Sequence, residues 1–252
     1  MELSWLPIIF FLVALFYSSV GFGGGSSYLA LLSIFLTEFY EVRSIALVLN
    51  IVVVSIGTFN FIRNQVFDFK SFWPFLVFSI PFAFIGAQIK LSEKVFFLIL
   101  GTSLLLAGVF MVLQTIKRKI ENEGELRIGK RIALGSGIGF LSGIAGIGGG
   151  IFLSPTLNLI GWKTPLKVAS LASIFILVNS TSGLIGLIYS GSFVFNNKTI
   201  LPLIAAAVLG GAIGSYLTNS KFNLNMIRLL TAILVTYVGL RLILLHGFGV
   251  RV

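Results

Sequence analysis

The sequence predicts an all-α polytopic membrane protein built from two homologous halves, and three observations lead to this fold class. Of the 252 residues, 57% are hydrophobic and only 10% are charged, whereas soluble domains carry about 25% charged residues. Several apolar runs reach the roughly 20 residues that a helix needs to cross a bilayer, without the polar and apolar alternation of membrane strands. A G-x-G-G-G string also occurs twice, at residues 21–25 and 146–150.

In the first half, apolar runs separated by polar turns predict five helices. We expect these helices at residues 5–20, 24–37, 43–63, 72–90 and 93–115. The first ends at the glycine string, and the polar turn T-E-F-Y-E-V-R at 37–43 ends the second. The third carries polar residues at its centre, including Asn50, and the loop at 64–68 separates it from the fourth. The fifth runs up to the most strongly charged stretch of the chain, which we interpret as a solvated connector.

In the second half, the same reasoning predicts five more helices. We expect these helices at residues 131–145, 149–160, 165–189, 199–218 and 223–245. The first again ends at a glycine string, and the turn G-W-K-T-P-L-K at 161–167 ends the second. Pro165 in that turn suits the start of the third helix, which carries Asn179 in a polar centre. The loop at 190–197 precedes the last two helices.

Features that recur in the same order predict a duplication. The two glycine strings are displaced by 125 residues, and I-G-A-Q-I at 85–89 matches I-G-S-Y-L at 213–217, displaced by 128. We therefore divide the chain into a first membrane repeat at 1–116, a cytoplasmic connector at 117–130 and a second membrane repeat at 131–252. Internal repeats are common in transporters and place the substrate site at the repeat interface near the midplane.

The segments that follow the glycines are too short to cross a membrane. Twelve to fourteen residues at 1.5 Å each give about 18–21 Å, against a hydrocarbon core of about 30 Å. Each segment can therefore form a glycine-tipped hairpin with the segment before it, entering the membrane and leaving on the same side. A hairpin plus three full spans crosses an odd number of times, so the second half would be inverted relative to the first.

The distribution of basic residues favours the inverted arrangement only slightly. With the connector in the cytoplasm, twelve basic residues lie on the cytoplasmic side: Arg63, Lys70, Lys117, Arg118, Lys119, Arg127, Lys130, Arg131, Lys163, Lys167, Lys221 and Arg228. The outside then holds the other six: Arg43, Lys90, Lys94, Lys198, Arg241 and Arg251. A parallel repeat, in which each hairpin is one broken traverse, gives a split of eleven to seven. Both satisfy the positive-inside rule, and both make this a multi-pass membrane protein.

The glycine strings have two interpretations. Glycine costs about 1 kcal/mol against alanine inside a helix, and two copies at matched positions suggest a purpose. Consecutive glycines permit positive φ, and the helix that begins after them presents free N–H groups and a positive dipole end, which favour an anion. Ser26 and Ser27 add hydroxyl donors in the first copy, where the second has Ile151 and Phe152. Alternatively, the glycines only permit close helix packing, the role expected for 135–139 and 210–214.

At these residues the chain resembles the TauE/SafE family of sulfite and organosulfonate exporters. The resemblance rests on V-G-F-G-G-G at 20–25, A-G-I-G-G-G-I-F-L-S-P at 145–155 and K-T-P-L-K-V-A-S-L-A-S at 163–173, and it covers nearly the whole chain. The first half departs from the family pattern with E-F-Y-E-V-R at 38–43, where the second half has the usual basic turn. The resemblance implies a transporter of sulfur-containing anions or related oxyanions across the inner membrane.

Our functional hypothesis is a secondary transporter that binds a small anion at the midplane and works by alternating access. The expected substrate-binding residues are Gly23, Gly24, Gly25, Ser26, Ser27, Gly148, Gly149, Gly150, Ile151, Asn50 and Asn179. The alternatives are a passive anion channel with the same site, or a membrane assembly factor that transports nothing. Catalytic constellations are lacking in the sequence, so we expect no enzyme activity.

Partners and anchors follow from the same composition. We expect a small anion and the lipid bilayer as partners, with no nucleic acid, cofactor or metal, and a second copy of the chain as a candidate partner; the coupling ion stays open. With no cysteine in the chain, thiolate chemistry is excluded. Arg43, Lys163 and Lys167 are expected to be topology anchors. Trp5, Trp73 and Trp162 stand near segment ends, where interface anchors belong.

Overall fold

The computed structural model describes residues 5–19, 23–36, 38–116, 125–194, 197–217 and 224–250, and this part of the chain is helical throughout, without strands. Its helices are α1 Leu6–Ser19, α2 Gly25–Phe35, α3 Phe39–Arg63, α4 Phe69–Gln88, α5 Glu93–Ile116, α6 Ile128–Ala145, α7 Gly150–Ile160, α8 Pro165–Tyr189, α9 Asn197–Tyr216 and α10 Leu224–Phe248. All ten expected segments are therefore helices, and their ends lie within four residues of the expected ones. Most of the connector, at 117–124, lies outside the described residues, as do Gly21 and Phe22 of the first glycine string.

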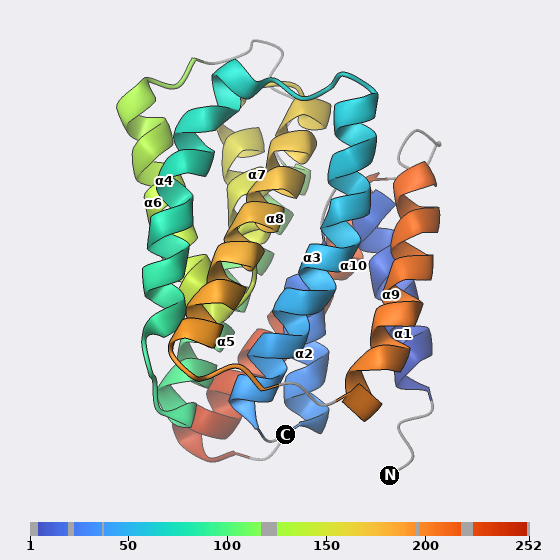
Figure 1. Ribbon diagram of the computed structural model, residues 1–252, viewed down its shortest axis with the longest axis vertical. Helices are drawn as coiled ribbons and strands as arrows, with labels where there is room; N and C mark the ends of the chain where they lie inside the picture. Colours follow the sequence, from blue (N-terminus) through green and yellow to red (C-terminus); the bar gives the residue numbers. More distant parts are fainter. Residues whose placement is uncertain are drawn as a thin grey trace.

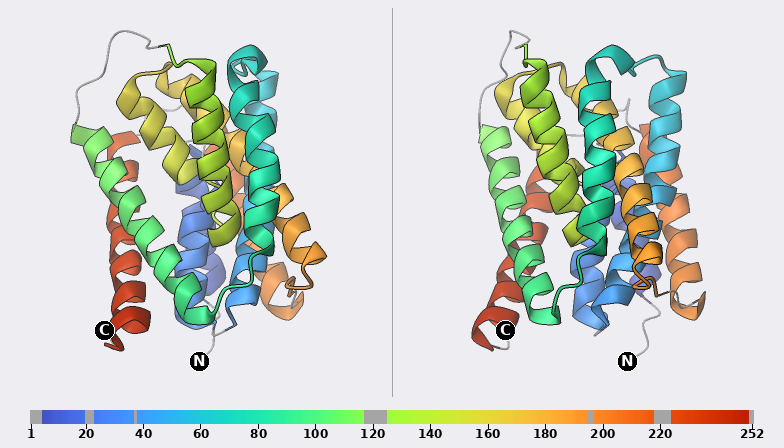
Figure 2. Two further views of the ribbon diagram at one scale, coloured as in Figure 1. Left: turned by 90° about the vertical axis from the view of Figure 1, so that its left-hand side faces the viewer. Right: turned by 60° about the vertical axis from the view of Figure 1, so that its left-hand side comes forward.

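The helices form three layers. Six of them stand in a row in which each contacts the next, in the order α6, α4, α8, α3, α9, α1. On the other side α5 packs against α10, and the two lie side by side at one edge of the molecule (Figure 2). The short helices α2 and α7 fill the space between, since α2 contacts α3 and α10 while α7 contacts α8 and α5. The two glycine strings thus lie in the middle layer.

The helix contacts repeat between the two halves. Each helix of the first half corresponds to the helix five places later, α1 to α6 and so on up to α5 and α10. When corresponding helices are exchanged, the order of the row is reversed and its contacts stay the same. The contacts of α2 with α3 and α10 likewise correspond to those of α7 with α8 and α5. Corresponding helices run in opposite directions, because α3 ascends in Figure 1 while α8 descends. The loops at 64–68 and 161–164 lie at the end where α5 ends and α6 begins, which we call the connector end (Figure 1).

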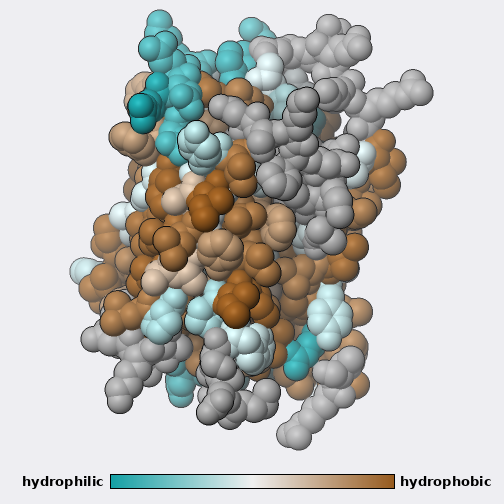
Figure 3. Space-filling model, turned by 90° about the vertical axis from the view of Figure 1, so that its right-hand side faces the viewer, coloured by the Kyte–Doolittle hydropathy of each residue, from teal (hydrophilic) through white to brown (hydrophobic). Residues whose placement is uncertain are grey.

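The surface and the helix lengths suit a membrane. An apolar band lies between hydrophilic ends on the face shown in Figure 3, and five helices are long and apolar enough to span a bilayer: Phe39–Arg63, Phe69–Gln88, Glu93–Ile116, Pro165–Tyr189 and Thr231–Phe248. By contrast α2 and α7 have 11 residues each, or about 17 Å. The chain is a multi-pass membrane protein, and its two central helices α2 and α7 are too short to span the bilayer.

Glycine stripes at 135–139 and 210–214 hold neighbouring helices together, as expected. A Cβ added at Gly139 of α6 would stand 2.7 Å from the carbonyl oxygen of Ser79 in α4. One at Gly214 of α9 would stand 2.1 Å from the carbonyl oxygen of Leu15 in α1. Only glycine permits this approach of two backbones, so these residues pack α4 against α6 of the second hairpin and α9 against α1 of the first.

One expected interface anchor is instead a core residue. Trp162 is fully buried, with its ring 5.2 Å from that of Phe75 and 6.1 Å from that of Phe72, and with the guanidinium of Arg131 over its face at 5.6 Å. The interpretation of Trp162 as an anchor was wrong, because the turn that carries it folds back onto α4. Trp5, at the start of α1, is 39% exposed.

Candidate functional site

The two glycine strings adopt matching conformations at the tips of their hairpins. Gly24 precedes α2 with φ 82° and ψ 3°, and Gly149 precedes α7 with φ 83° and ψ −12°. These left-handed values favour glycine, which adopts them at no steric cost. A glycine has no side chain with which to cap the amides of the following turn, so the first amides of α2 and α7 remain free to bind a ligand.

Each tip packs against the same position of a long helix. A Cβ at Gly25 would stand 2.0 Å from Nδ2 of Asn50 in α3, and a Cβ at Gly150 would stand 2.3 Å from Cδ1 of Ile176 in α8. Both Asn50 and Ile176 are twelfth in their helices. The last glycine of each string therefore lets this side chain lie directly on the helix start.

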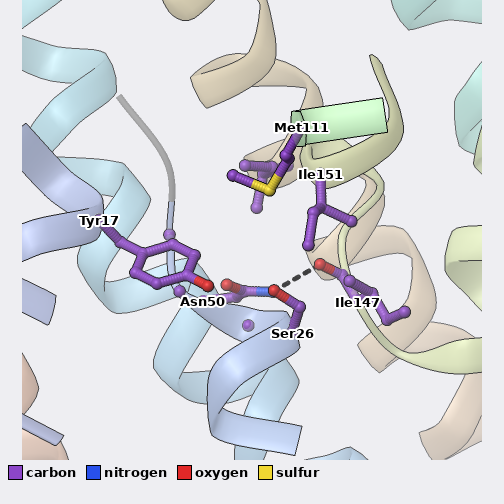
Figure 4. Close-up of a pocket in the computed structure, with 10 residues that line it drawn as sticks. Tyr17, Ser26, Asn50, Met111, Ile147 and Ile151 are labelled. Atoms are coloured by element: carbon purple, nitrogen blue, oxygen red, sulfur yellow. Dashed lines mark hydrogen bonds between the residues drawn. The ribbon is translucent and has the colours of Figure 1, made fainter. Parts of the chain in front are cut away.

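The tips meet at a small cavity in the middle layer. Its lining is Tyr17, Gly23, Gly24, Gly25, Ser26, Asn50, Met111, Ile147, Ile151 and Ile176. Figure 4 shows Tyr17, Asn50 and Ser26 converging from α1, α3 and α2, with Met111 and Ile151 opposite. The amide Nδ2 of Asn50 donates to the carbonyl oxygen of Ile147 at 3.1 Å, which joins the first half to the second tip. The cavity has room for about one water molecule, so the site is closed in this conformation.

The cavity is polar on the side of the first half and apolar on the side of the second. Tyr17, Ser26 and Asn50 supply side-chain oxygen or nitrogen atoms. At the positions that match Ser26 and Asn50, the second half has Ile151 and Ile176. The duplication thus yields one two-faced cavity, in which the two glycine tips are alike and the side chains beside them differ.

Several buried polar atoms near the tips have no hydrogen-bond partner among the described residues. They are Tyr28 Oη and Asn50 Oδ1 at the first tip, and Ser142 Oγ and Ser180 Oγ at the second. Contacts place them there, since Tyr28 Oη lies 3.0 Å from a Cβ built at Gly24 and Ser180 Oγ lies 2.8 Å from one at Gly148. An unpaired buried polar atom costs roughly 1–3 kcal/mol, which a bound polar ligand or water would recover.

The other expected site residues lie beside the cavity and do not line it. Ser27 is hydrogen-bonded to the hydroxyl of Tyr17. Gly148 packs against Ile176 and Ser180, and Gly149 packs against Phe175. Asn179 turns its amide nitrogen onto the carbonyl oxygen of Phe175 in its own helix, at 2.9 Å. Its Oδ1 atom is buried without a partner.

Sequence reasoning missed four lining residues: Tyr17, Met111, Ile147 and Ile176. Ile147 lies inside the second glycine string, and Ile176 holds the position that corresponds to Asn50, so aligning the halves helix by helix would have found both. Tyr17 comes from α1 of the first hairpin and Met111 from α5, which contacts α7 of the second, and only this helix packing brings them to the cavity.

Arg43 was expected to be a surface anchor, and this was wrong. Its side chain is 1% exposed, and Nη2 donates to the carbonyl oxygens of Gly143 at 2.8 Å and Ala87 at 3.4 Å. These carbonyls belong to the last turns of α6 and α4, where helical C=O groups lack partners and the dipole is negative. Gly146, in the turn to the second tip, packs on the Arg43 stem. Arg43 therefore stabilises the turn between α6 and α7, which forms the tip of the second hairpin.

The comparison with known proteins agrees with this architecture. A model of the sulfite exporter TauE/SafE family matches residues 6–242. The chain belongs to this family. Within the TauE/SafE family it is similar to the probable membrane transporter protein y4hK of Sinorhizobium fredii, with 30% identity over 247 residues, 96% of this chain and 98% of that protein.

A second TauE/SafE relative is more distant. The probable membrane transporter protein YunE of Bacillus subtilis is 28% identical over 207 residues, or 74% of each chain. No solved structure matches the chain significantly. The names of the family and of both relatives indicate a membrane transporter rather than an enzyme.

Proposed function

We propose that this protein is a secondary transporter that moves a small sulfur-containing oxyanion, such as sulfite or an organosulfonate, by alternating access. The observation that carries the proposal is the small cavity where the two glycine-preceded helix starts meet and where Asn50 Oδ1 is buried without a partner among the described residues. Helix N-termini attract anions without a charged side chain. The name of the family supplies the chemical class of the anion.

We infer that the two halves are inverted repeats and that they move against each other. The opposite directions of α3 and α8 and the matched helix contacts support this inference. An inverted repeat places one tip on each side of the shared cavity, so that tilting one half opens the site to one face of the membrane and closes it to the other. The bond from Asn50 to the carbonyl oxygen of Ile147 joins the halves, and we expect it to break and re-form in each cycle.

The uneven cavity predicts how the anion lies. Charged oxygen atoms face Ser26, Asn50 and the amides after Gly24, because these groups donate hydrogen bonds. The remaining substituent, a lone pair in sulfite or a carbon chain in a sulfonate, faces Ile151 and Ile176. The polar side of the cavity therefore determines affinity, and the apolar side determines which sulfur anion fits.

We assign the connector end to the cytoplasm and the protein to the inner membrane. Among basic residues with described side chains, seven stand at the connector end: Arg63, Lys70, Arg127, Lys130, Arg131, Lys163 and Lys167. The other four are Arg43, Lys90, Lys94 and Arg241, and one of them, Arg43, is buried. An excess of exposed Lys and Arg marks the cytoplasmic side.

A flux assay tests the proposal. Purified protein in liposomes should take up sulfite or a small sulfonate with saturation and with counterflow, and Gly25→Ala should abolish uptake, because its Cβ would clash with Asn50. Gly137→Ala is the matched control, since nothing lies within 4 Å of a Cβ there. Single-channel currents without counterflow would favour a passive channel. Equal uptake by both variants would contradict a substrate site at the glycine strings.

A further inference from the structure

A second cavity lies between the central site and the connector end. Its lining is Ser18, Gly57, Asn60, Phe61, Asn64, Val66, Leu166 and Ser215, so it draws on α1, α3, α8, α9 and the loop that precedes α4. It has room for about four to six water molecules. In this conformation it is the roomier of the two cavities, and residues of both halves form its walls.

Two helices, α1 and α3, line both the central cavity and the second cavity. Tyr17 lines the central cavity and the next residue, Ser18, lines the second. On α3, Asn50 lines the central cavity and Gly57 the second, seven residues or about 10 Å further towards the connector end. Asn64 and Val66 lie beyond the end of α3, so the second cavity extends to the loops.

The walls of this cavity combine the polar side chains of Ser18, Asn60, Asn64 and Ser215 with apolar ones. Nδ2 of Asn60 in α3 donates to Oγ of Ser215 in α9 at 3.0 Å. Beside Gly57, Thr58 and Ser173 share a hydrogen bond of 2.9 Å between α3 and α8. Polar side chains inside a bundle line water-filled paths or join helices. Here Asn60 and Ser215 line the cavity and also join α3 to α9.

The electrostatic setting at the connector end favours anions. The pKa of the Asp68 carboxyl is lowered, mainly by its hydrogen bonds with Ser71 and also by the positive charges of Lys167 and Lys163. Both lysines therefore act on the loop that carries Val66. Arg63, exposed at the end of α3, adds a third positive charge, and a mouth of this sign raises the local concentration of anions.

We propose that the second cavity is the antechamber through which the anion passes between the central site and the connector-side solution. It rests on the proposed function, since an antechamber needs a transported anion. The barrier between the cavities is the end of α1, where Tyr17 bonds to Ser27 of the first tip. Separation of the end of α1 from the start of α2 opens this barrier and joins the two cavities.

The absence of cysteine from the chain makes cysteine labelling a direct test. Ser215→Cys places a thiol in the antechamber, and Asn64→Cys places one at its outer end. Ile213→Cys is the control, because Ile213 lies on the outer face of the same helix and is 46% exposed. The probes are an anionic sulfonatoethyl and a cationic trimethylammonium-ethyl methanethiosulfonate, added to vesicles of known orientation.

We expect Ser215→Cys and Asn64→Cys to react at least tenfold faster from the connector side than Ile213→Cys, and the anionic reagent to be favoured relative to its reaction with a free thiol. Labelled Ser215→Cys should lose transport of methanesulfonate, while treated Ile213→Cys keeps it. Three results would overturn the proposal: Ser215→Cys and Asn64→Cys react only from the opposite side, neither of them reacts, or they prefer the cationic reagent. Labelling needs no transport, so failure of the antechamber and failure of the transporter hypothesis are distinguishable.

Discussion

At the scale of single residues, the position shared by Asn50 and Ile176 shows how duplication produced an uneven site. Both side chains lie on the last glycine of a string, and only Asn50 brings polar atoms. Its nitrogen donates one of its two hydrogens to the Ile147 carbonyl, which leaves the second hydrogen for the anion and the oxygen as an acceptor for a water molecule. The amide thus joins the halves and faces the cavity at once.

Replacing Asn50 by alanine should weaken substrate binding more than folding. One hydrogen bond of about 1–1.5 kcal/mol is lost, which corresponds to roughly a tenfold higher half-saturation concentration in the flux assay. Asn158→Ala serves as the comparison, because the Asn158 amide bonds only to Ser154 within its own helix. An unchanged half-saturation concentration in Asn50→Ala would remove this residue from the site.

Arg43 supports the second hairpin, so its loss should appear in stability. Arg43→Ala leaves the carbonyls of Gly143 and Ala87 without their donor, at a cost of roughly 1–3 kcal/mol. The thermal midpoint in detergent should fall clearly, whereas exposed Arg63→Ala should change it little. A midpoint of Arg43→Ala within error of the parent protein would contradict this role.

At the scale of helices, α4 combines a capped start with a glycine-matched face. Oδ1 of Asp68 accepts from the backbone amide of Ser71 at 3.2 Å, and Oδ2 accepts from its hydroxyl at 2.8 Å. Further along, α4 packs on the glycine stripe of α6. The cap sets where the helix begins, and the stripe sets how close it comes to the second hairpin.

The cap should make stability depend on pH at the acid end. The lowered pKa of Asp68 means that its contribution is full above the carboxyl pKa of the unfolded chain, about 3.9, and disappears as the pH falls through the lower folded value. Asp68→Ala should cost about 1 kcal/mol at pH 7. The gap in thermal midpoint between the two proteins should close below pH 4, and a gap that widens there would refute the cap.

The stripe of α6 should tolerate a methyl group at one position and reject it two residues away. Gly139→Ala forces a Cβ to within 2.7 Å of the Ser79 carbonyl oxygen, and overpacking of this kind costs roughly 1–3 kcal/mol. Gly137→Ala meets nothing within 4 Å and should be neutral or stabilising. Thermal unfolding of the two variants checks this, and equal midpoints would mean that the helices separate freely.

At the scale of the whole molecule, the fold followed from the sequence far better than the site did. Hydropathy and turn residues are local signals, and they located all ten helices, including the two short ones that follow the glycines. The cavity depends on how the helices pack around the two glycine tips, which no local pattern encodes, so Tyr17 and Met111 were missed. Arg43 and Trp162 were misjudged for a related reason: both lie near segment ends, where exposure is the usual outcome, yet here neighbouring helices cover them.

The central claim is that an anion binds where the two glycine tips meet, and an anomalous difference map of crystals grown with selenite, a heavier analogue of sulfite, tests it most directly. We predict one selenium peak in the cavity, with oxygen atoms within hydrogen-bond distance of the amides after Gly24 and of Ser26 or Asn50, and competition by sulfite should erase it. A map with its selenium peak outside the glycine tips would contradict the account.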